Sequence, residues 1–352
     1  MTVAGAGMAG LVCAARARQL GAAPVVYEKG TRPGGSMLLS SCVVWRYRTL
    51  EDFRHECAGG DETLQRLIVD RLDDALGWLE SLGAPVVRRE TRNPRTAGVR
   101  FDPVGLTDAL VRAAGEVRLG ETIDRPLVLA TGGFAGDHEL VTRYITPQPL
   151  ALRANPWSSG DGLRAGLAAG GALTGGMDEF YGRNMPDAPF GEADFVPLAQ
   201  LYADRAHVVD DAGRPFLEHA PTWSETDVVQ ATARQPGARA WYLLDDEALA
   251  DADVAARVER ARGAGAPVLE PARIPFAVPD GIRVGVYVHA AITHTIGGLR
   301  VDEHARVLRD DGAPLDGLYA AGVDAGGVST GGYASGLAQA LVLGLAAAEH
   351  LC

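Results

Sequence analysis

The first thirty residues alternate short apolar runs with a glycine-rich turn and a helical pattern. Val3–Gly10 reads VAGAGMAG, in which an apolar strand ends in the spacing GxGxxG. Apolar residues recur at helical spacing over Leu11–Leu20, and Gly21 ends the run. Val25–Glu28 is a second short apolar strand that ends in an acid. The pattern predicts a β-α-β unit at the start of the chain.

This β-α-β unit has the residue types that a dinucleotide requires. Gly5 permits a tight turn, Gly7 lets the backbone approach a pyrophosphate, and Gly10 lets the helix pack closely on the strand. The N–H groups at the helix N-terminus then face the phosphates. Glu28 stands about 20 residues further on, where a carboxylate that binds a ribose is expected. The alternative is a glycine-rich turn in an unrelated α/β protein.

Apolar periodicity predicts further elements along the chain. An amphipathic helix begins after the capping residue Asp61 and ends before Gly83, and its single apolar face predicts a scaffold role at the surface. Buried strands run into glycine turns at Pro126–Gly133 and Gly317–Gly322, as parallel strands do where they enter a ligand site. The remaining predicted elements are helices over Gly105–Ala114, Ser159–Ala169, Asp245–Arg262 and Gly336–His350, and a strand-turn-strand over Val208–Phe216.

The chain changes character beyond Pro147, where prolines, tryptophans and tyrosines crowd together and the periodicity weakens until about Ala290. A length of 352 residues suits about two domains. The pattern therefore predicts a substrate domain inserted between two α/β parts.

Composition favours a small-molecule substrate as the partner. The formal net charge is −12, so neither a nucleic acid nor an anionic membrane is expected to bind. No apolar run approaches the ~20 residues of a membrane span, and no basic leader precedes the first strand. Cys13, Cys42, Cys57 and Cys352 lack the spacing of a metal site, so no metal is expected and a reducing cytoplasm is the predicted location. The sequence does not specify an electron acceptor.

Blocks of sequence at both ends and in the middle of the chain carry a family pattern. The blocks are GAGMAG with Glu28 and GGS, LVLATGGFAGDHEL, SSGDGLRAGLAAGG, and HTIGGLRVDEHARVL joined to GLYAAGVDAGGVSTGGYASGLAQAL. Together they resemble the FAD flavoproteins that include soluble fumarate reductases and 3-ketosteroid Δ1-dehydrogenases. The resemblance implies an α/β fold: a Rossmann-like FAD-binding domain with a parallel sheet, and an inserted α+β substrate (cap) domain. The implied ranges are 1–147 and 291–352 for the FAD-binding domain and 148–290 for the cap.

The resemblance implies FAD as the cofactor, placed by the protein through several separate glycine contacts. Binding is expected to be noncovalent, because Ser36–Trp45 contains no histidine of the kind that carries a covalent flavin. Asp324 would lie by the ribityl chain, and Ser335–Leu337 would begin a helix that faces the flavin N1–C2 carbonyl, where its dipole stabilises reduced anionic flavin. The implied cofactor-binding residues are Gly5, Gly7, Met8, Ala9, Gly10, Glu28, Lys29, Gly35, Ser36, Ala130, Thr131, Gly132, Asp161, Gly322, Asp324, Ser335, Gly336 and Leu337.

The family's shared reaction moves a hydride between flavin N5 and a carbon next to a carbonyl or carboxylate, and His294 and Tyr333 are the catalytic residues that the resemblance implies. His294, in HTIGG, matches the histidine that binds a substrate oxygen in fumarate reductases; the alternative is a buried histidine bonded to backbone. Tyr333, in GGYASG, stands where those reductases have a substrate-binding arginine and ketosteroid-type dehydrogenases have tyrosine. A phenol that donates to a ketone oxygen acidifies the α-hydrogen. The alternative for Tyr333 is packing at the flavin edge.

The segment Phe216–Trp223 matches the part of fumarate reductases that supplies an arginine acid, but Thr222 stands at that position. An arginine from elsewhere in the chain, Arg183 or Arg205, could take the place of this acid. Tyr47, Tyr181 and Tyr287 are other possible bases. His289 lies in no comparable motif and is expected to be structural.

The sequence therefore predicts an FAD-dependent oxidoreductase that acts on CH–CH groups. A dehydrogenase or desaturase that forms a C=C bond next to a ketone is favoured, and a fumarate- or enoate-type reductase is the alternative. A flavin-binding protein without catalysis is a third possibility. Two features depart from the family: the first strand is clipped, and Leu119–Asp124 leads almost directly to Pro126, without the usual β-meander.

Overall fold

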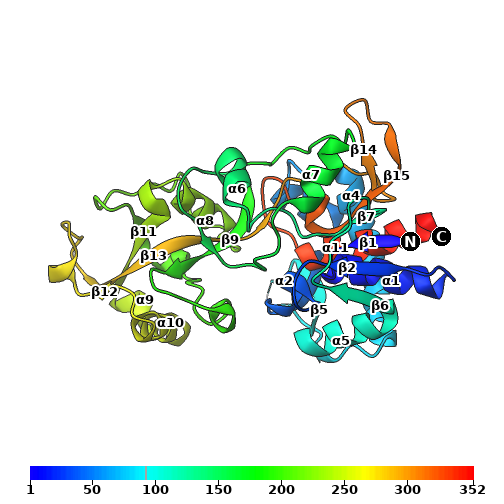
Figure 1. Ribbon diagram of the computed structural model, residues 1–352. Coiled ribbons are helices and arrows are strands. Elements are labelled where there is room, and N and C mark those ends of the chain that lie inside the picture. The colour runs from blue at the N-terminus through cyan, green and yellow to red at the C-terminus, as the bar shows by residue number, and fades with distance from the viewer. Residues whose placement is uncertain (92) are drawn as a thin grey trace. The chain divides into compact units, whose positions relative to one another are not determined.

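The predicted β-α-β unit is present in the computed structural model, which describes residues 1–91 and 93–352 (Figure 1). β1 (Thr2–Ala4) and β2 (Val25–Glu28) are parallel neighbours, and α1 (Met8–Gln19) connects them. Gly5 has a φ of 100°, which residues with a side chain rarely adopt. A Cβ on Gly10 would lie 1.9 Å from the Gly5 carbonyl oxygen. Only glycine at position 10 therefore allows α1 to pack this closely on the turn.

Contacts within the chain divide it into two units. Unit 1 comprises Met1–Val141, Ala154–Glu179 and His294–Cys352, and unit 2 comprises Thr142–Arg153 and Phe180–Thr293. Both ends of the chain thus contribute to unit 1. The segment Ala154–Glu179 falls inside the range that the sequence suggested for the cap, but it belongs to unit 1. Its contacts explain this: a Cβ on Gly166 would meet the Leu299 side chain, and the Thr174 N–H donates to the Gly298 carbonyl at 3.0 Å.

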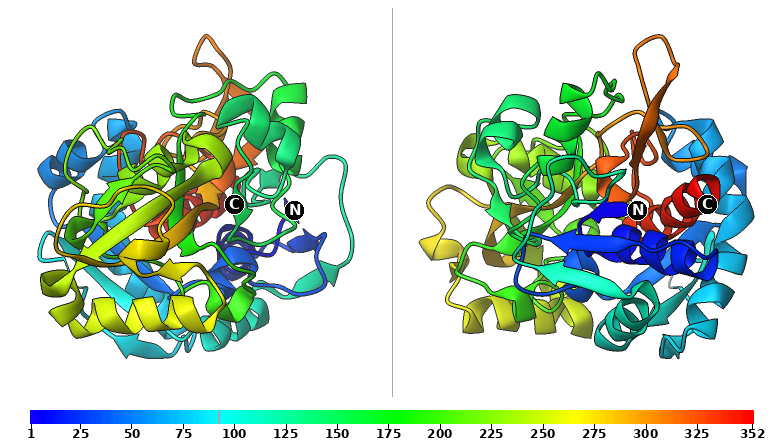
Figure 2. Two further views of the ribbon diagram at one scale, coloured as in Figure 1. Left: turned by 90° about the vertical axis from the view of Figure 1, so that its left-hand side faces the viewer. Right: turned by 45° about the vertical axis from the view of Figure 1, so that its right-hand side comes forward.

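A six-stranded sheet with the order β14-β15-β7-β1-β2-β6 lies at the centre of unit 1. From β15 to β6 all neighbouring strands are parallel, and β14 is antiparallel to β15 at one edge. α1 packs against α5 and α11, and α11 lies beside the sheet strands in Figure 2. The sheet confirms the predicted α/β class. The other strands of this sheet are β6 (Glu116–Leu119), β7 (Val128–Leu129), β14 (Arg306–Leu308) and β15 (Pro314–Ala320), and the two helices are α5 (Pro103–Ala114) and α11 (Gly336–Leu351).

A small antiparallel sheet in unit 1 has the order β3-β5-β4, and its strand β3 contacts α11. β3 (Val43–Tyr47) also contacts α4 (Glu62–Ser81), whose predicted cap Asp61 accepts from the Leu64 N–H at 3.1 Å. Residues 120–127, between β6 and β7, contain no strand, in keeping with the short connection in the sequence. The other elements of unit 1 are α2 (Gly35–Leu38), α3 (Leu50–Glu56), β4 (Val86–Arg88), β5 (Thr96–Phe101), α6 (His138–Tyr144, which continues into unit 2), α7 (Asp161–Ala168) and η5 (Gly322–Asp324).

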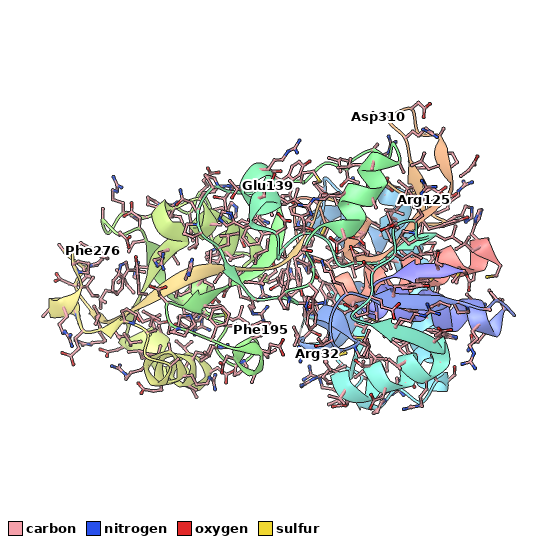
Figure 3. The ribbon with its side chains drawn as sticks, viewed as in Figure 1. Arg32, Arg125, Glu139, Phe195, Phe276 and Asp310 are labelled. Atoms are coloured by element: carbon pink, nitrogen blue, oxygen red, sulfur yellow. The ribbon has the colours of Figure 1, made fainter. Side chains whose placement is uncertain are left out.

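Unit 2 is built on an antiparallel sheet with the order β10-β11-β13-β12, and β8 and β9 also pair with β13. Buried valine, alanine and tyrosine side chains on this sheet pack with α10 to form its core. Phe276, labelled in Figure 3, lies in the loop before β13, and its ring centroid is 6.1 Å from that of Trp241. The elements of unit 2 are β8 (Ala151–Leu152), β9 (Phe180–Pro186), η1 (Glu192–Asp194), η2 (Ala203–Arg205), β10 (His207–Val209), α8 (Thr226–Ala233), η3 (Pro236–Ala238), β11 (Arg239–Asp245), α9 (Asp246–Ala250), α10 (Ala252–Gly263), β12 (Val268–Leu269), η4 (Pro271–Arg273) and β13 (Ile282–Thr295).

The single helix predicted over Asp245–Arg262 is wrong, because the structure has two helices, α9 and α10. Asp251 stands between them with extended backbone (φ −74°, ψ 118°), and its carboxylate accepts from the Asp253 and Val254 N–H groups. An aspartate that caps a new helix interrupts the run without interrupting the alanine-rich, charged composition. None of the described helices is long and apolar enough to cross a membrane.

Candidate functional site

The nucleotide cradle, defined as Gly5–Gly10, Glu28–Gly30 and Gly34–Ser36, brings the first glycine block and Glu28 together. Glu28 is 6% exposed, and its two carboxylate oxygens accept from the Ala6 N–H at 2.8 Å and the Gly30 N–H at 2.7 Å. Each oxygen retains a lone pair, so the carboxylate still suits the hydroxyls of a ribose. The Gly34 N–H donates to the Ala6 carbonyl at 2.7 Å, which joins the second glycine loop to the first.

Open space lies over the N-terminus of α1. A Cβ on Gly7 would meet nothing within 4 Å, and no side chain caps the helix at this residue. Met8 and Ala9 are the first residues of α1, so their N–H groups are among those without a partner inside the helix. Unpaired N–H groups and the positive end of the helix dipole favour an anion. The cradle therefore fits the pyrophosphate of a dinucleotide such as FAD.

Lys29 and Asp161, both predicted to bind the cofactor, are paired with each other. The Lys29 ammonium donates to the Asp161 carboxylate and to the Ser159 hydroxyl, each at 2.5 Å. Asp161 is the first residue of α7. The pair neutralises the charge of Lys29 beside Glu28, and a direct contact of either residue with FAD stays a prediction.

Asp324 holds the turn that follows β7. Its buried carboxylate accepts from the N–H and hydroxyl groups of Thr131 and from the Gly133 N–H at 2.9 Å. Burial raises the pKa of Asp324, and these hydrogen bonds oppose the increase. The Thr131 oxygen in turn accepts from the Gly162 N–H at 2.9 Å. Asp324 thus joins Ala130–Gly133 to η5 and α7, and the predicted contact with the ribityl chain stays a prediction.

Gly322, at the start of η5, lies against the cradle. A Cβ on Gly322 would come within 3.0 Å of the Ala9 side chain. Gly35 and Ser36 begin α2, and a Cβ on Gly35 would lie 3.2 Å from the Gly7 Cα. The structure therefore places these predicted cofactor residues next to α1.

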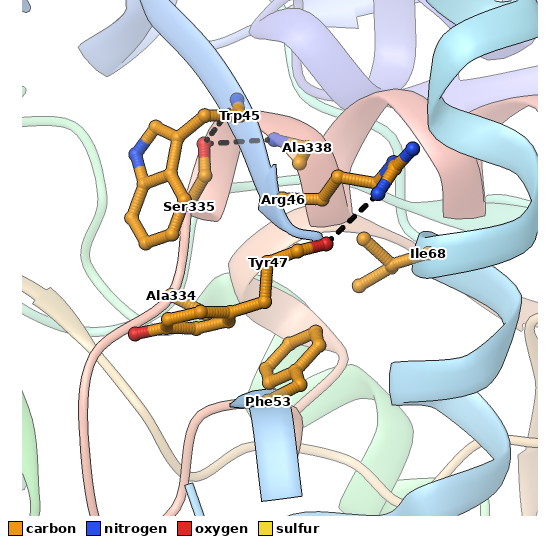
Figure 4. Close-up of a pocket in the computed structure, with 8 residues that line it drawn as sticks. All are labelled: Trp45, Arg46, Tyr47, Phe53, Ile68, Ala334, Ser335 and Ala338. Atoms are coloured by element: carbon orange, nitrogen blue, oxygen red, sulfur yellow. Dashed lines mark hydrogen bonds between the residues drawn. The ribbon is translucent and has the colours of Figure 1, made fainter. Parts of the chain in front are cut away.

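Tyr333 lies in the Tyr333 loop, defined as Val328–Ser335. Figure 4 shows Trp45 and Tyr47 of β3 beside Ala334 and Ser335 of this loop. The Tyr47 hydroxyl donates to the Tyr333 carbonyl at 2.7 Å, and the Trp45 ring centroid lies 5.4 Å from that of Tyr333. The Tyr333 N–H donates to the Cys57 sulfur, whose pKa burial raises to about 12. Both backbone polar groups of Tyr333 are therefore held by side chains from residues 47–57.

Ser335 ends this loop as the cap of α11. Its hydroxyl oxygen accepts from the Ala338 N–H at 3.3 Å and from the Trp45 N–H at 3.4 Å (Figure 4). The hollow between β3, Phe53, Ile68 and the start of α11 is too tight to admit a water molecule. The loop is therefore densely packed on this side.

Gln65 of α4 supports the same loop from inside unit 1. It is 0% exposed, and its amide nitrogen donates to the carbonyls of Cys57 at 2.9 Å and Val328 at 3.0 Å. Its amide oxygen accepts from the Arg54 guanidinium at 3.0 Å. Sequence periodicity described α4 only as an amphipathic scaffold. A buried glutamine on its apolar face was the available signal for a further role.

His294 lies against the first turn of α11. A Cβ on Gly336, which precedes Leu337 there, would come within 3.1 Å of His294 Nε2. Nδ1 lies 3.2 Å from the Thr295 carbonyl, so Nδ1 carries the hydrogen of that bond. Burial lowers the pKa of His294, which keeps the imidazole neutral near pH 7. In this tautomer Nε2 accepts a hydrogen bond, whereas the predicted donation to a substrate oxygen requires the other tautomer.

The position of the missing arginine acid, Thr222 in unit 2, faces a carboxylate. The Thr222 hydroxyl donates to Asp227 at 2.5 Å, and its N–H donates to the second oxygen of Asp227 at 3.0 Å. The Arg183 guanidinium donates to the Ser224 carbonyl at 2.6 Å and lies over the Tyr181 ring, 4.7 Å from its centroid. Exposed Arg205 lies 3.7 Å from Asp204. Arg183 thus contacts Ser224, which lies two residues after Thr222.

Other titratable groups of unit 2 have structural surroundings. Burial raises the pKa of Glu225 to about 7, although the Ala203 N–H donates to its carboxylate at 2.9 Å. Burial and a hydrogen bond to Asp211 raise the pKa of Tyr287 to about 12, which makes this phenol a poor base near pH 7. His289 donates to the Pro149 carbonyl at 2.5 Å, and burial lowers its pKa. Within residues 1–91 and 93–352, no three His, Cys, Asp or Glu residues are arranged to hold a metal ion.

The sequence matches the family described as FAD binding domain over residues 106–336, which is more than half of the chain. The chain belongs to this FAD-binding family. Residues 3–57 also match the NAD(P)-binding Rossmann-like domain. The match confirms the predicted cofactor, FAD, and the class of FAD-dependent oxidoreductases, and the nucleotide cradle lies in the part matched by the Rossmann-like domain.

By their names, the proteins similar to this chain include both reductases and dehydrogenases. A fumarate reductase (cytochrome) of Shewanella frigidimarina is 23% identical over 92% of this chain and 71% of its own length. The open conformation of a flavocytochrome c3 fumarate reductase has a TM-score of 0.72, with 21% identity over 99% of this chain and 77% of that one. The 3-ketosteroid Δ1-dehydrogenase of Sterolibacterium denitrificans has a TM-score of 0.71, with 16% identity over 99% and 98% of the two chains. These structural likenesses show the shared fold.

Proposed function

We propose that this FAD-binding protein is a dehydrogenase or desaturase that forms a C=C bond next to the ketone, or a related carbonyl, of a small molecule. FAD, held noncovalently, would supply the acceptor for the hydride, and the proton of the carbon next to the carbonyl would leave to a base or to water. The observation that carries the proposal is the carboxylate of Asp227 at Thr222, where a reductase of this family would need a cation. A neutral ketone needs no such cation.

Tyr333 has the role of binding the carbonyl oxygen. A hydrogen bond from its phenol withdraws electrons from the carbonyl and makes the neighbouring C–H more acidic. The bonds from Tyr47 and to Cys57 fix the backbone on both sides of Tyr333, which supports a defined position for the phenol. His294, held neutral by burial, adds no positive charge beside the start of α11. This setting suits a neutral carbonyl better than a dicarboxylate.

A fumarate- or enoate-type reductase is the second candidate, and the fumarate reductase relative supports it. Such an enzyme binds carboxylates by charge-assisted hydrogen bonds, each worth about 1.5–3 kcal/mol. Arg183 would have to supply one of them, and it already donates to the Ser224 carbonyl. A flavin-binding protein without catalysis is the third candidate, and its flavin would respond to no substrate.

Anaerobic flavin spectroscopy separates these candidates. We expect the purified protein to be yellow and one of a panel of cyclic ketones, including 3-ketosteroids, to bleach its flavin absorbance. Fumarate should reoxidise the dithionite-reduced protein negligibly. Rapid reoxidation by fumarate would establish the reductase, and a flavin that responds to neither panel would establish the binding protein. Flavin that stays attached after acid precipitation would contradict noncovalent binding.

A cytoplasmic location is proposed together with this function. Cys13, Cys42 and Cys57 are buried free thiols, and Cys352 is an exposed one. Free thiols persist in a reducing compartment, which supports the proposal.

A further inference from the structure

The loop Asn155–Ser159 in unit 1 is fixed against the nucleotide cradle. The Trp157 ring lies directly over Gly30, since a Cβ on Gly30 would come within 2.3 Å of a ring carbon. Lys29 donates to the Ser159 hydroxyl at 2.5 Å. These contacts anchor the loop beside Glu28, although the predicted cofactor residues include none of its five members.

The side-chain amide of Asn155 has one defined orientation. Asn155 is 8% exposed, and its Oδ1 accepts from the Trp157 N–H at 3.2 Å. A backbone N–H only donates, so the atom that faces it must be the amide oxygen. The Nδ2 group, with its two hydrogens, therefore points to the other side.

Nδ2 points to the open N-terminus of α1. It lies 3.7 Å from the position that a Cβ on Gly35 would occupy, and that position is 3.2 Å from Gly7 Cα and 3.8 Å from Gly7 N. The amide of Asn155 and the two glycines thus meet around one point. In the part of the chain that the structure describes, Nδ2 has no hydrogen-bond acceptor. This oriented donor at a largely buried side chain is thus available to an acceptor on a ligand that lies over Gly7 and Gly35.

We propose that Asn155 donates hydrogen bonds to the pyrophosphate of bound FAD. The site already offers the N–H groups and the dipole of α1, and Asn155 adds an oriented donor from a segment some 150 residues away. Lys29 is a weaker candidate for this contact because Asp161 already neutralises its charge. An amide also matches the phosphate without the cost of burying a cation.

Binding measurements on the apoprotein test this assignment. Asn155→Ala removes the donor, and Asn155→Asp keeps the acceptor for the Trp157 N–H but turns a carboxylate toward the phosphates. We expect the affinities for FAD and ADP to fall about 10-fold in Asn155→Ala and about 100-fold in Asn155→Asp. Adenosine, which has no phosphate, should bind both variants as it binds the wild type. Isothermal titration and flavin fluorescence measure these affinities without any substrate, so the result is independent of the proposed reaction.

The matched control is Asn184→Ala in unit 2, because Asn184 is also a buried asparagine. Its amide donates to Thr232 and Tyr242, each at 2.9 Å, so its loss should lower the melting temperature and leave the affinity for FAD and ADP unchanged. Affinities for FAD and ADP within about twofold of the wild type in Asn155→Asp would overturn the proposal. An equal loss for adenosine and ADP would overturn it too, since the contact would then be with the nucleoside. If Asn155→Ala does not fold, Asn155→Asp, which preserves the turn, decides the question.

Discussion

The nucleotide cradle and the Tyr333 loop both belong to unit 1, but they are held in different ways. In the cradle, close backbone approach and the Glu28 carboxylate, which bonds residues in its own β-α-β unit, make the site. The Tyr333 loop depends on side chains that lie more than 260 residues earlier in the chain, among them Tyr47 and Gln65. A local motif can thus specify cofactor binding, whereas the position of a reactive side chain depends on remote support.

Tyr333→Phe should have the largest effect of the variants at the Tyr333 loop. The variant loses the phenol that binds the carbonyl oxygen but keeps the ring contact with Trp45 and the backbone bonds of the loop. We expect the rate of flavin reduction by a ketone to fall about 100- to 1,000-fold, with FAD retained. Anaerobic stopped-flow spectroscopy measures the rate. A variant that reduces its flavin at the wild-type rate would assign Tyr333 to packing alone.

Glu28→Ala should have the largest effect at the cradle. It removes the acceptor for the ribose and leaves the Ala6 and Gly30 N–H groups without their partner. A charge-assisted hydrogen bond contributes about 1.5–3 kcal/mol, so FAD affinity should fall roughly 10- to 150-fold. Titration of the apoprotein with FAD measures this change. Glu28→Gln is the control, because it retains one acceptor and should lose less affinity; unchanged affinity in Glu28→Ala would assign Glu28 to the fold.

The sequence predicted the β-α-β unit of the cradle correctly because its determinants are close together in the chain. The spacing of Gly5, Gly7 and Gly10 and the acid at Glu28 describe one β-α-β unit, and the structure has that unit. Asn155 was not predicted, since its relation to Gly7 and Gly35 arises only when α7 and its preceding loop pack in unit 1. Periodicity reports which face of an element is buried, and it carries no information about distant partners.

The lack of information about distant partners also limits what the sequence predicts for the Tyr333 loop and His294. Tyr333 and His294 were selected from short motifs, and the structure places both near the start of α11. The support from Gln65 was missed, because a helical pattern treats a glutamine as a surface residue and this one is fully buried. Asp324 was predicted as a cofactor ligand, and its bonds to Thr131 and Gly133 could not be read from a pattern of glycines.

Gln65→Leu tests whether the hydrogen bonds from Gln65 of α4 control the position of the Tyr333 loop. A leucine of similar size leaves the carbonyls of Cys57 and Val328 without their donor, at a cost of about 1–3 kcal/mol in the free energy of unfolding. We expect kcat for the ketone to fall more than KM changes, because the Tyr333 phenol shifts with its loop and its hydrogen bond to the carbonyl oxygen matters most in the transition state. Steady-state kinetics and urea unfolding measure the two effects.

The control for this variant is Gln235→Leu in unit 2, whose amide donates to the Ala231 carbonyl at 3.3 Å. It should leave kcat close to the wild-type value. If Gln65→Leu lowers stability but keeps the wild-type kcat, Gln65 supports the fold without positioning Tyr333.

His294→Gln should have the smallest effect, and it appears in the pH dependence of stability. Burial lowers the pKa of His294 below its ordinary value near 6.5. Between the lowered pKa and 6.5, the unfolded chain binds a proton that the folded chain does not, so the free energy of unfolding rises with pH in that window and is lost as the pH falls through it. Removing the imidazole should reduce this slope by at most about 1.4 kcal/mol per pH unit.

Urea unfolding of the wild type and the variant from about pH 5 to about pH 8 measures the slope. His289→Gln is the matched control, because burial also lowers the pKa of His289 and its loss should reduce the slope in the same direction while ketone turnover persists. Carboxylates contribute to all the proteins alike, so the difference between wild type and variant isolates the imidazole. An unchanged slope in His294→Gln would mean that His294 titrates as it does in the unfolded chain. Burial would then not keep the imidazole beside Gly336 neutral, and the contrast in charge between the Tyr333 loop and the nucleotide cradle would be lost.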